Sequence, residues 1–331
     1  MAARNRAPRA AYLVPASTTN LGPGFDCLGI ALKLYNHFEA ELAPGWSFEA
    51  QGEGADVLGK QERNFVIEAM QQVFAEALCS DLAARVASEN AVPLANGLGS
   101  SSTALVGGML LARDLLRQLP NDVDSARIPD DARLFQLLTD AEGHPDNVAP
   151  ALMGGFTICW TDETFEGRAP AQAHCYRSQP SAGVATVVVP SHRGLHTSDA
   201  RQVLPDQVSR ADAVSNLSHT ALLVAAILDG RGDMLQTAMS NDRLHEPYRV
   251  SLIDGFEAIR AALLEAGADG VFLSGAGPTV AALVIGPDDE VALTRACDVA
   301  NAFNERSGCS FPDRFPARAL GIAREGAVKV G

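Results

Sequence analysis

The sequence lacks the features that would place it in a membrane or secreted class. It has no run of 18 or more apolar residues, and its basic N-terminus is not followed by an apolar stretch long enough for a secretory signal. Its six cysteines are scattered and form no C-x-x-C pair, so neither a disulfide framework nor a zinc site is expected. We therefore expect a soluble protein of the reducing cytoplasm, with no membrane partner.

Basic side chains are also scarce. Lysine and arginine number 26 against 40 acidic residues, which gives a net charge of −14. Such a surface repels nucleic-acid backbones and anionic headgroups, so no nucleic-acid partner is expected. Any bound phosphate must then be held by groups that contact it directly, because the electrostatic field of the net negative charge repels it.

The length and the order of elements indicate two domains. At about 150 residues per domain, 331 residues suggest two, and 47% hydrophobic with 20% charged residues is typical of a globular chain. The loop-rich stretch Asp162–Gly183 is the best candidate boundary, which divides the chain into residues 1–170 and 171–331. Strands and helices are mixed throughout, so the fold class is α+β.

Apolar periodicity predicts the individual elements. The expected strands are Ala10–Pro15, Ile30–Leu42, Trp46–Gln51, Ala83–Ser88, Gly154–Thr161, Val184–Pro190, Gly270–Ser274 and Val280–Ile285. The expected helices are Asn64–Leu78, Ser101–Leu119, Asp131–Glu142, Asn216–Asp229, Leu252–Ala266 and Asp288–Glu305. The segment GHPDNVAP is expected to end the helix at Glu142, and the HRGLH pair His192 and His196 is interpreted as part of a loop rather than a metal site.

Two glycine-rich segments are candidates for a phosphate loop. GADVLGKQ approaches the pattern G-x-x-x-x-G-K-[ST], but Gln61 stands where a hydroxyl should meet Mg²⁺, so we expect a surface loop there. In PLANGLGSSST, Gly97 and Gly99 let the backbone approach an anion, and three serines follow where a helix begins, one of which can cap it. The alternative is a flexible loop that only precedes a core helix.

The order of several motifs resembles a known family. VPASTTNLGPGFDCLGIAL, PLANGLGSSST and LSGAGPTVAAL are similar to the three ordered motifs of the GHMP small-molecule kinases. NLGPGFDCLG, EGHPDNVAPALMGG, TSDARQVLP and HEPYR resemble the homoserine kinase family in particular. The resemblance implies a two-domain GHMP kinase fold, with an N-terminal ATP-binding domain like ribosomal protein S5 and a ferredoxin-like C-terminal domain. It also implies transfer of phosphate from ATP to the side-chain hydroxyl of L-homoserine, a step of threonine biosynthesis.

By resemblance, one set of residues holds the nucleotide and its metal ion. Ser101 and Glu142 match the Mg²⁺ ligands, and oxygen donors suit a hard cation. A polar residue at a helix end is the alternative for Glu142, and a helix N-cap explains Asn64 equally well. The residues implied in ATP binding are Pro93, Leu94, Ala95, Asn96, Gly97, Leu98, Gly99, Ser100, Ser101, Ser102, Thr103 and Asn64. Asn96 departs from the family, in which arginine is frequent at this position.

A second set is implied around the acceptor amino acid. Arg201 and Arg249 match the pair that binds its carboxylate, for which guanidinium groups give bidentate hydrogen bonds. The whole implied set is Asn20, Asp26, His144, Asp146, Arg201, Arg249 and Gly277. Asp146, Asn20 and Ser101 are the candidate catalytic residues.

The residues leave three points open. Asp146 can act as a general base, or the γ-phosphate oxygens can accept the proton without one. Gly277-Pro278 can shape the site or only fix a tight connection between strands. Other GHMP kinases that act on different alcohols, and a non-catalytic binding protein on the same fold, are the alternative functions, and a homodimer is an open expectation.

Overall fold

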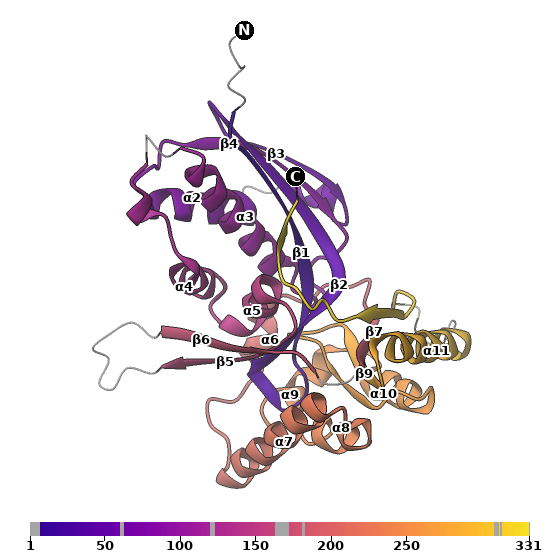
Figure 1. Cartoon of the computed structure of the whole chain (residues 1–331). Helices are drawn as coiled ribbons and strands as arrows, with labels where there is room; N and C mark the ends of the chain where they lie inside the picture. Colours follow the sequence, from indigo (N-terminus) through magenta and orange to yellow (C-terminus); the bar gives the residue numbers. More distant parts are fainter. Residues whose placement is uncertain are drawn as a thin grey trace.

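The structure is a computed structural model that describes residues 7–59, 63–119, 123–162, 172–180, 183–307, 311 and 313–330. Two sheets organise the chain, one in each half of the molecule (Figure 1). The strands are β1 Arg9–Asn20, β2 Gly24–Ala43, β3 Ser47–Gly52, β4 Ala83–Asn90, β5 Phe156–Asp162, β6 Gln172–Ser178, β7 Gly183–Val189, β8 Gly270–Leu273, β9 Val280–Gly286, β10 Arg318–Gly321 and β11 Val328–Lys329.

The first sheet has seven strands. Five follow the order β11-β1-β2-β4-β3, β5 pairs with β2 near its N-terminal end at Leu28–Ile30, and β6 pairs with β5. All its pairs are antiparallel except β3 with β4. The register of β1 against β2 shifts after Pro15 and again after Thr19, and the second shift lies at the turn that carries Asn20. The long β2 therefore reaches from the first lobe into the junction with the second (Figure 1).

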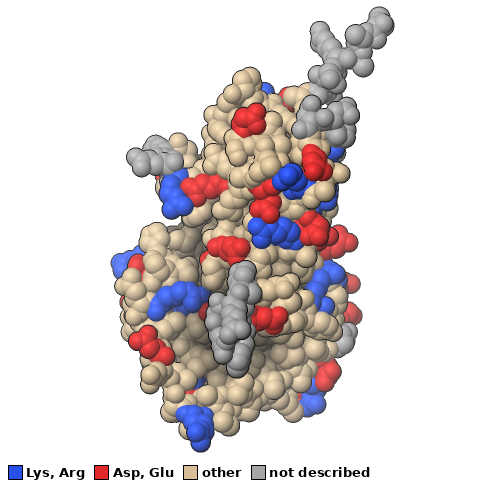
Figure 2. Space-filling model, turned by 90° about the vertical axis from the view of Figure 1, so that its left-hand side faces the viewer, with Lys and Arg blue, Asp and Glu red and all other residues tan. Residues whose placement is uncertain are grey.

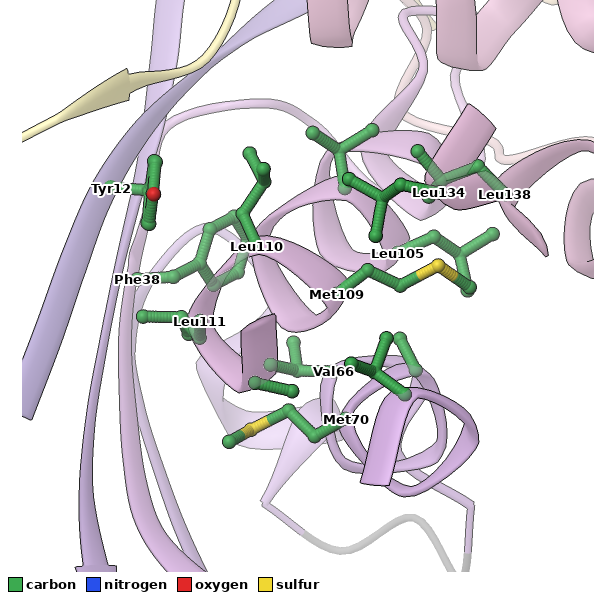
Figure 3. Close-up of a cluster of buried hydrophobic side chains, with 14 of the residues drawn as sticks. Tyr12, Phe38, Val66, Met70, Leu105, Met109, Leu110, Leu111, Leu134 and Leu138 are labelled. Atoms are coloured by element: carbon green, nitrogen blue, oxygen red, sulfur yellow. The ribbon is translucent and has the colours of Figure 1, made fainter. Parts of the chain in front are cut away.

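Helices cover one face of this sheet and build the first core. The helices of the chain are α1 Ala55–Leu58, α2 Phe65–Glu76, α3 Ser100–Arg117, α4 Asp131–Glu142, α5 Pro145–Met153, α6 Thr197–Gln202, α7 Arg210–Asp229, α8 Gly232–Met239, α9 Glu246–Arg249, α10 Phe256–Glu265 and α11 Asp289–Ser307. Apolar side chains of α2, α3 and α4 meet Tyr12 and Phe38 of the sheet (Figure 3). A methyl group at Gly107 would lie 2.5 Å from the Phe38 ring, so the glycines of α3 allow the helix to pack this closely.

The second sheet has the antiparallel order β10-β7-β9-β8. Every residue of β7 and β9 is buried, which explains why these strands read as continuous apolar runs rather than alternating ones. One face packs on α10 and α11 around Phe256, Ile259 and Phe303. The other face shares a core with Leu28 and Ile30 of β2, so the two sheets are joined by buried apolar contacts.

Most expected elements are present, and two expectations are wrong. GHPDNVAP does not only end a helix, because Pro145 is the first residue of α5 and His144 is its N-cap. Proline suits the first helical position, where its missing N–H has no partner to lose. The stretch expected as loop from residue 162 to residue 183 contains β6, which returns to the first sheet. Residues 55–58 of the GADVLGKQ segment form a surface turn of helix, and Lys60 and Gln61 lie outside the described residues.

Within the described part of the chain, α7 is the helix whose length and composition would allow it to cross a membrane. Core helices of soluble proteins meet the same condition. Leu223, Ala226 and Ile227 on one face of α7 are buried in the core that joins the two sheets. The composition of this helix is therefore accounted for in part by packing.

A buried carboxyl group links α9 to the second sheet. Oε1 of Glu246 accepts a hydrogen bond of 2.6 Å from the backbone N–H of Leu273, and Arg260 lies 3.7 Å from Oε2. Burial raises the pKa of Glu246 from its ordinary value of 4.5 to about 8, against the opposing effect of Arg260. Between pH of about 4.5 and about 8, Glu246 thus keeps its proton in the folded state but has lost it in the unfolded state.

We therefore expect the free energy of unfolding to fall as the pH rises from about 4.5 to about 8, because the buried group must then ionise. Glu246→Gln keeps an acceptor for Leu273 but removes this ionisation. Urea denaturation at about pH 5 and about pH 9 should give a smaller pH-dependent loss of stability for the variant. An equal loss in both proteins would contradict the assignment.

Candidate active site

A cavity of about 410 Å³ lies where segments from the whole length of the chain meet. Its wall is formed by the β1–β2 turn, the loop before α3, the corner between α4 and α5, the start of α6, and the loop between β8 and β9. These are the segments that carry the sequence motifs. Figure 2 shows basic and acidic side chains interspersed over one face, so binding of an anion here depends on groups inside the cavity.

Two glycines shape the loop before α3 where it lines the cavity. Gly97 and Gly99 both have φ of +71°, a conformation that favours glycine. The expected serine cap is absent, because Gly99 occupies the N-cap position and no side chain caps the helix. The first-turn N–H groups of Ser100 and Ser101 therefore have no capping side chain to compete with a ligand, and the helix dipole favours an anion there.

Hydrogen bonds join the three glycine-containing motifs. Ser274 Oγ donates to the carbonyl of Gly97 at 2.6 Å and lies 2.7 Å from the hydroxyl of Thr18. Asn20 Nδ2 donates to the carbonyl of Gly275 at 2.7 Å. The loop between β8 and β9, which contains a cis Gly277-Pro278 bond, thus lies directly against the loop before α3.

This close approach makes Gly97 sensitive to a single methyl group. A methyl at Gly97 would lie 2.2 Å from the carbonyl oxygen of Ser274 and 2.8 Å from that of Gly277, so one loop must move. We expect Gly97→Ala to raise the KM for ATP by at least about tenfold, since a displacement of about 1 Å can cost about 100-fold in rate.

Gly267→Ala is the matched control for Gly97→Ala. Gly267 also has positive φ, but a methyl there would meet its nearest neighbour only at 3.9 Å, and the residue lies outside the cavity wall. Steady-state kinetics of the two variants should differ, and an unchanged KM for ATP in Gly97→Ala would contradict the role of this loop.

Asn36 of β2 holds the start of the same loop, and the sequence reasoning missed it. Its Oδ1 accepts hydrogen bonds from the N–H groups of Ala91 and Val92, and its Nδ2 donates to Thr103 Oγ1 at 2.8 Å. The side chain is 1% exposed and therefore fixed between a strand, a loop and a helix. An asparagine inside an expected strand gives no sequence signal for such a role without a register.

A carboxylate lies beside the serines of α3. Glu142, the last residue of α4, accepts hydrogen bonds through Oε1 from Ser102 at 2.9 Å and from Ser101 at 3.3 Å. Burial raises the pKa of Glu142. No cluster of three or more His, Cys, Asp or Glu side chains suited to a metal occurs among the described residues.

Asp146 and His144 lie at the start of α5. His144 Nδ1 and Asp146 Oδ1 are 2.6 Å apart, and Asp146 is 1% exposed although it lines the cavity. Burial lowers the pKa of His144, but the hydrogen bond with Asp146 and its negative charge outweigh that effect, so the net shift is upward. The contact with Asp146 therefore stabilises the protonated form of His144.

Two arginines from separate motifs come together at the same end of the cavity. Arg201 of α6 donates two hydrogen bonds of 2.9 and 3.0 Å to the carboxylate of Asp26. Arg249 is almost fully buried, and burial lowers its pKa to about 10. The guanidinium carbons lie 5.8 and 5.1 Å from the ring centre of Phe25, which the sequence reasoning did not select. Phe25 also stacks on His245, which precedes Arg249 by four residues and whose Nδ1 lies 3.4 Å from the Arg249 guanidinium.

The opposite end of the cavity is more apolar. Phe48, Leu58, Phe65 and Leu105 line it together with Asn64. The side chain of Asn64 accepts hydrogen bonds from the N–H groups two and three residues later, so Asn64 caps α2 as well as lining the cavity. Both interpretations of Asn64 are thus compatible with its position.

The cavity wall includes most of the selected residues. The selected residues that line it are Asn20, Asp26, Asn64, Leu94, Ala95, Asn96, Gly97, Gly99, Ser100, Ser101, Glu142, His144, Asp146, Arg201, Arg249 and Gly277. Pro93, Leu98, Ser102 and Thr103 are not in the wall. Leu98 is buried in the core between the sheets, and Ser102 acts on the wall through its hydrogen bond to Glu142. Asn96, where the family often has arginine, accepts a hydrogen bond from the Ser191 N–H.

Comparison with known proteins identifies relatives over most of the chain. Residues 64–155 match the family model "GHMP kinases N terminal domain", and residues 223–304 match "GHMP kinases C terminal". A homoserine kinase of Synechococcus sp. is 42% identical over 291 residues, which covers 87% of this chain and 89% of that protein. One of Nostoc punctiforme is 40% identical over 272 residues, or 82% and 84% of the two chains. A crystal structure of homoserine kinase from Cytophaga hutchinsonii, 24% identical, superposes with a TM-score of 0.77 over 100% of both chains and supports the fold.

Proposed function

The chain belongs to the homoserine kinase family of the GHMP kinases, and from this premise we propose how its cavity divides between two substrates. The enzyme transfers the γ-phosphoryl group of ATP to the side-chain hydroxyl of L-homoserine, a step of threonine biosynthesis. The observation that supports the division best is the meeting of the loop before α3 with Arg201, Arg249 and Asp146 in one cavity. The fold is the two-domain α+β fold of the GHMP kinases.

We propose that ATP lies along the loop before α3. The more apolar end near Phe48 and Phe65 accommodates the base, and the N–H groups that follow Gly97 and Gly99 donate hydrogen bonds to the phosphate oxygens. The start of α3 and Asp146 line the same cavity, so a γ-phosphate held at the start of α3 shares that cavity with Asp146. Phosphoryl transfer needs this alignment and charge stabilisation more than covalent chemistry.

A magnesium ion fits the donors beside the phosphates. Glu142 and Ser101 supply a carboxylate and a hydroxyl oxygen, which are the ligand types that Mg²⁺ prefers. Burial that raises the pKa of Glu142 makes its charged form costly, and an adjacent cation would offset that cost. When bound, the ion neutralises charge that develops on the transferred group.

The other end of the cavity suits an amino acid. Arg201 and Arg249 offer two guanidinium groups to the carboxylate, while Asp26 and Asp146 supply negative charge for the ammonium. Asn20 and Gly277 complete this part of the wall. His144 bonds to Oδ1 of Asp146, and we propose that Oδ2 orients the acceptor hydroxyl and removes its proton.

The assignment of Arg201 predicts a selective change in acceptor binding. Arg201→Lys keeps a positive charge but loses the planar pair of donors, so the KM for homoserine should rise by about tenfold, equivalent to about 1.4 kcal/mol. The KM for ATP should change little. Arg231→Lys is the control, because Arg231 makes a similar two-bonded contact with Asp233 at the surface. Equal effects on both substrates would contradict the assignment.

A panel of alcohols tests the choice of acceptor. The rate of ADP formation should be compared with homoserine, mevalonate or a hexose as the phosphoryl acceptor, at equal concentrations and with Mg²⁺ present. We expect turnover with homoserine and little with acceptors that lack the ammonium and carboxylate. Turnover of another alcohol in preference to homoserine would favour a different GHMP kinase activity, and no turnover would favour a binding protein.

Several broader assignments complete the proposal. We propose a division into two domains between residues 170 and 171, and the two family models match on either side of it. Two strands that follow the division, β6 and β11, nevertheless belong to the first sheet. We place the enzyme in the cytoplasm, acting on a small molecule without a nucleic-acid or membrane partner, in keeping with its net charge of −14. A homodimer remains part of the proposal, and size-exclusion chromatography with light scattering tests it.

A further inference from the structure

Three cysteines that are distant in sequence form one row across three neighbouring strands. Cys159 of β5 lies directly opposite Cys175 of β6. Leu28 of β2 pairs with Ile158, so Cys27 comes level with Cys159 one position further along the antiparallel register. Hydrogen bonds connect the row, because the backbone N–H of Cys159 donates to the sulfur of Cys27 and the thiol of Cys159 donates to the sulfur of Cys175.

The two thiols that face each other differ in their surroundings. Cys159 is 2% exposed and packs in the first core, whereas Cys175 is partly exposed. The hydrogen bond to Cys175 and burial raise the pKa of Cys159. The hydrogen bond from Cys159 lowers the pKa of Cys175, with Arg177 acting in the same direction against the effect of burial. Cys175 is thus the more accessible of the two thiols and the one whose pKa is lowered.

We propose that Cys175 and Cys159 form a peroxide-sensitive pair, in which Cys175 is oxidised and Cys159 then closes a reversible disulfide. The Cys175 thiolate attacks one oxygen of hydrogen peroxide, the O–O bond breaks, and a sulfenic acid and hydroxide form. The Cys159 sulfur displaces the hydroxyl group as water, which gives the S–S bond. Two electrons and two protons from a dithiol reductant restore both thiols.

The pair is connected to the active site through α5. Cys159 packs in the same cluster as Val148, Ala149 and Ala151 of that helix, whose first turn holds Asp146. The backbone of Asp146 lies close to β2, since a methyl at Gly29 would be 2.6 Å from the Asp146 carbonyl oxygen. A disulfide requires Cβ atoms about 3.5–4.5 Å apart, while opposite residues of antiparallel strands are about 4.5–5.5 Å apart. The strands must therefore approach, and the movement is transmitted to α5.

The site can be tested by oxidising the full-length protein with hydrogen peroxide, blocking free thiols with N-ethylmaleimide under denaturing conditions, and digesting with trypsin. Cleavage after Arg168 separates Cys159 from Cys175, so a disulfide appears as two linked peptides. We expect this linked species, its loss with dithiothreitol and its absence in Cys175→Ser. Cys297→Ser, which removes an exposed cysteine on α11, should retain it.

Activity provides the second measurement. Oxidation should lower kcat/KM for homoserine by about tenfold or more, because a displacement of about 1 Å can cost about 100-fold in rate. Dithiothreitol should restore it, and Cys175→Ser, whose activity before oxidation should be normal, should resist the loss. Peptides of Cys159 and Cys175 recovered only as separate alkylated or over-oxidised species would overturn the pair. A fully linked protein of unchanged activity would overturn the connection to α5.

Discussion

Asp146→Asn should lower kcat by about 100-fold or more while the KM for ATP stays within about twofold, because a positioned general base contributes about 10²–10⁴-fold. The amide keeps the size of the side chain and a hydrogen-bond acceptor for His144, so the position of α5 is preserved. The carboxylate is buried at the start of a helix and lines the acceptor end of the cavity. The substitution removes the group that we propose takes the hydroxyl proton.

Asp26→Asn is the comparison variant for Asp146→Asn. It also changes a carboxylate that lines the cavity, but Asp26 contacts Arg201, whereas Asp146 contacts His144. We expect that variant to act mainly on the KM for homoserine. Initial rates at varied ATP and varied homoserine separate the two effects, and a thermal melt controls for folding. An unchanged kcat in Asp146→Asn would exclude Asp146 as the base and favour proton acceptance by the phosphate oxygens.

Glu142→Gln should show the second large effect, a loss of about 100-fold in kcat at low Mg²⁺ that higher Mg²⁺ partly restores. Removal of one preorganised oxyanion-hole donor from an acyl-transfer site costs about 10²–10³-fold in kcat, and we expect a loss of the same order here. The carboxamide can still accept from Ser101 and Ser102, so the local hydrogen bonds are kept. Titration of the rate with Mg²⁺ at saturating ATP measures the change in apparent affinity.

Asp140→Asn is the matched control for Glu142→Gln. Asp140 lies on the same helix but is exposed, and its carboxylate bonds to Gln136 rather than to the serines of α3. Its replacement should leave the Mg²⁺ titration unchanged. Identical titrations of Glu142→Gln and the wild-type enzyme would exclude Glu142 as a metal ligand.

The parts of this site that depend on local sequence could be predicted. Gly97 and Gly99 before a serine run indicate a loop whose backbone can approach an anion. The helix expected at Asp131–Glu142 has those bounds, and in the structure Asp130 caps its start and Gly143 ends it. The resemblance to known motifs supplied the acceptor residues, which composition and periodicity alone do not identify.

The rest depends on register and long-range packing. Asn36 lies in a segment expected as a strand, but the sequence does not say which loop its side chain meets. Phe25 lies before the expected strand Ile30–Leu42, and its contact with the two guanidinium groups follows only from the fold. Cys27, Cys159 and Cys175 are far apart in the sequence, and their alignment follows only from the pairing of β2, β5 and β6. The segment GHPDNVAP predicts only the end of a helix, whereas in the structure Pro145 is the first residue of α5.

The most direct test of the account is the identity of the product. The purified protein should be incubated with ATP, Mg²⁺ and L-homoserine, with ADP followed by a coupled assay and the phosphorylated product by phosphorus NMR. The account predicts one phosphomonoester on the side-chain oxygen of homoserine for each ADP formed. ADP formation without phosphohomoserine, or no reaction at all with a folded protein, would contradict it.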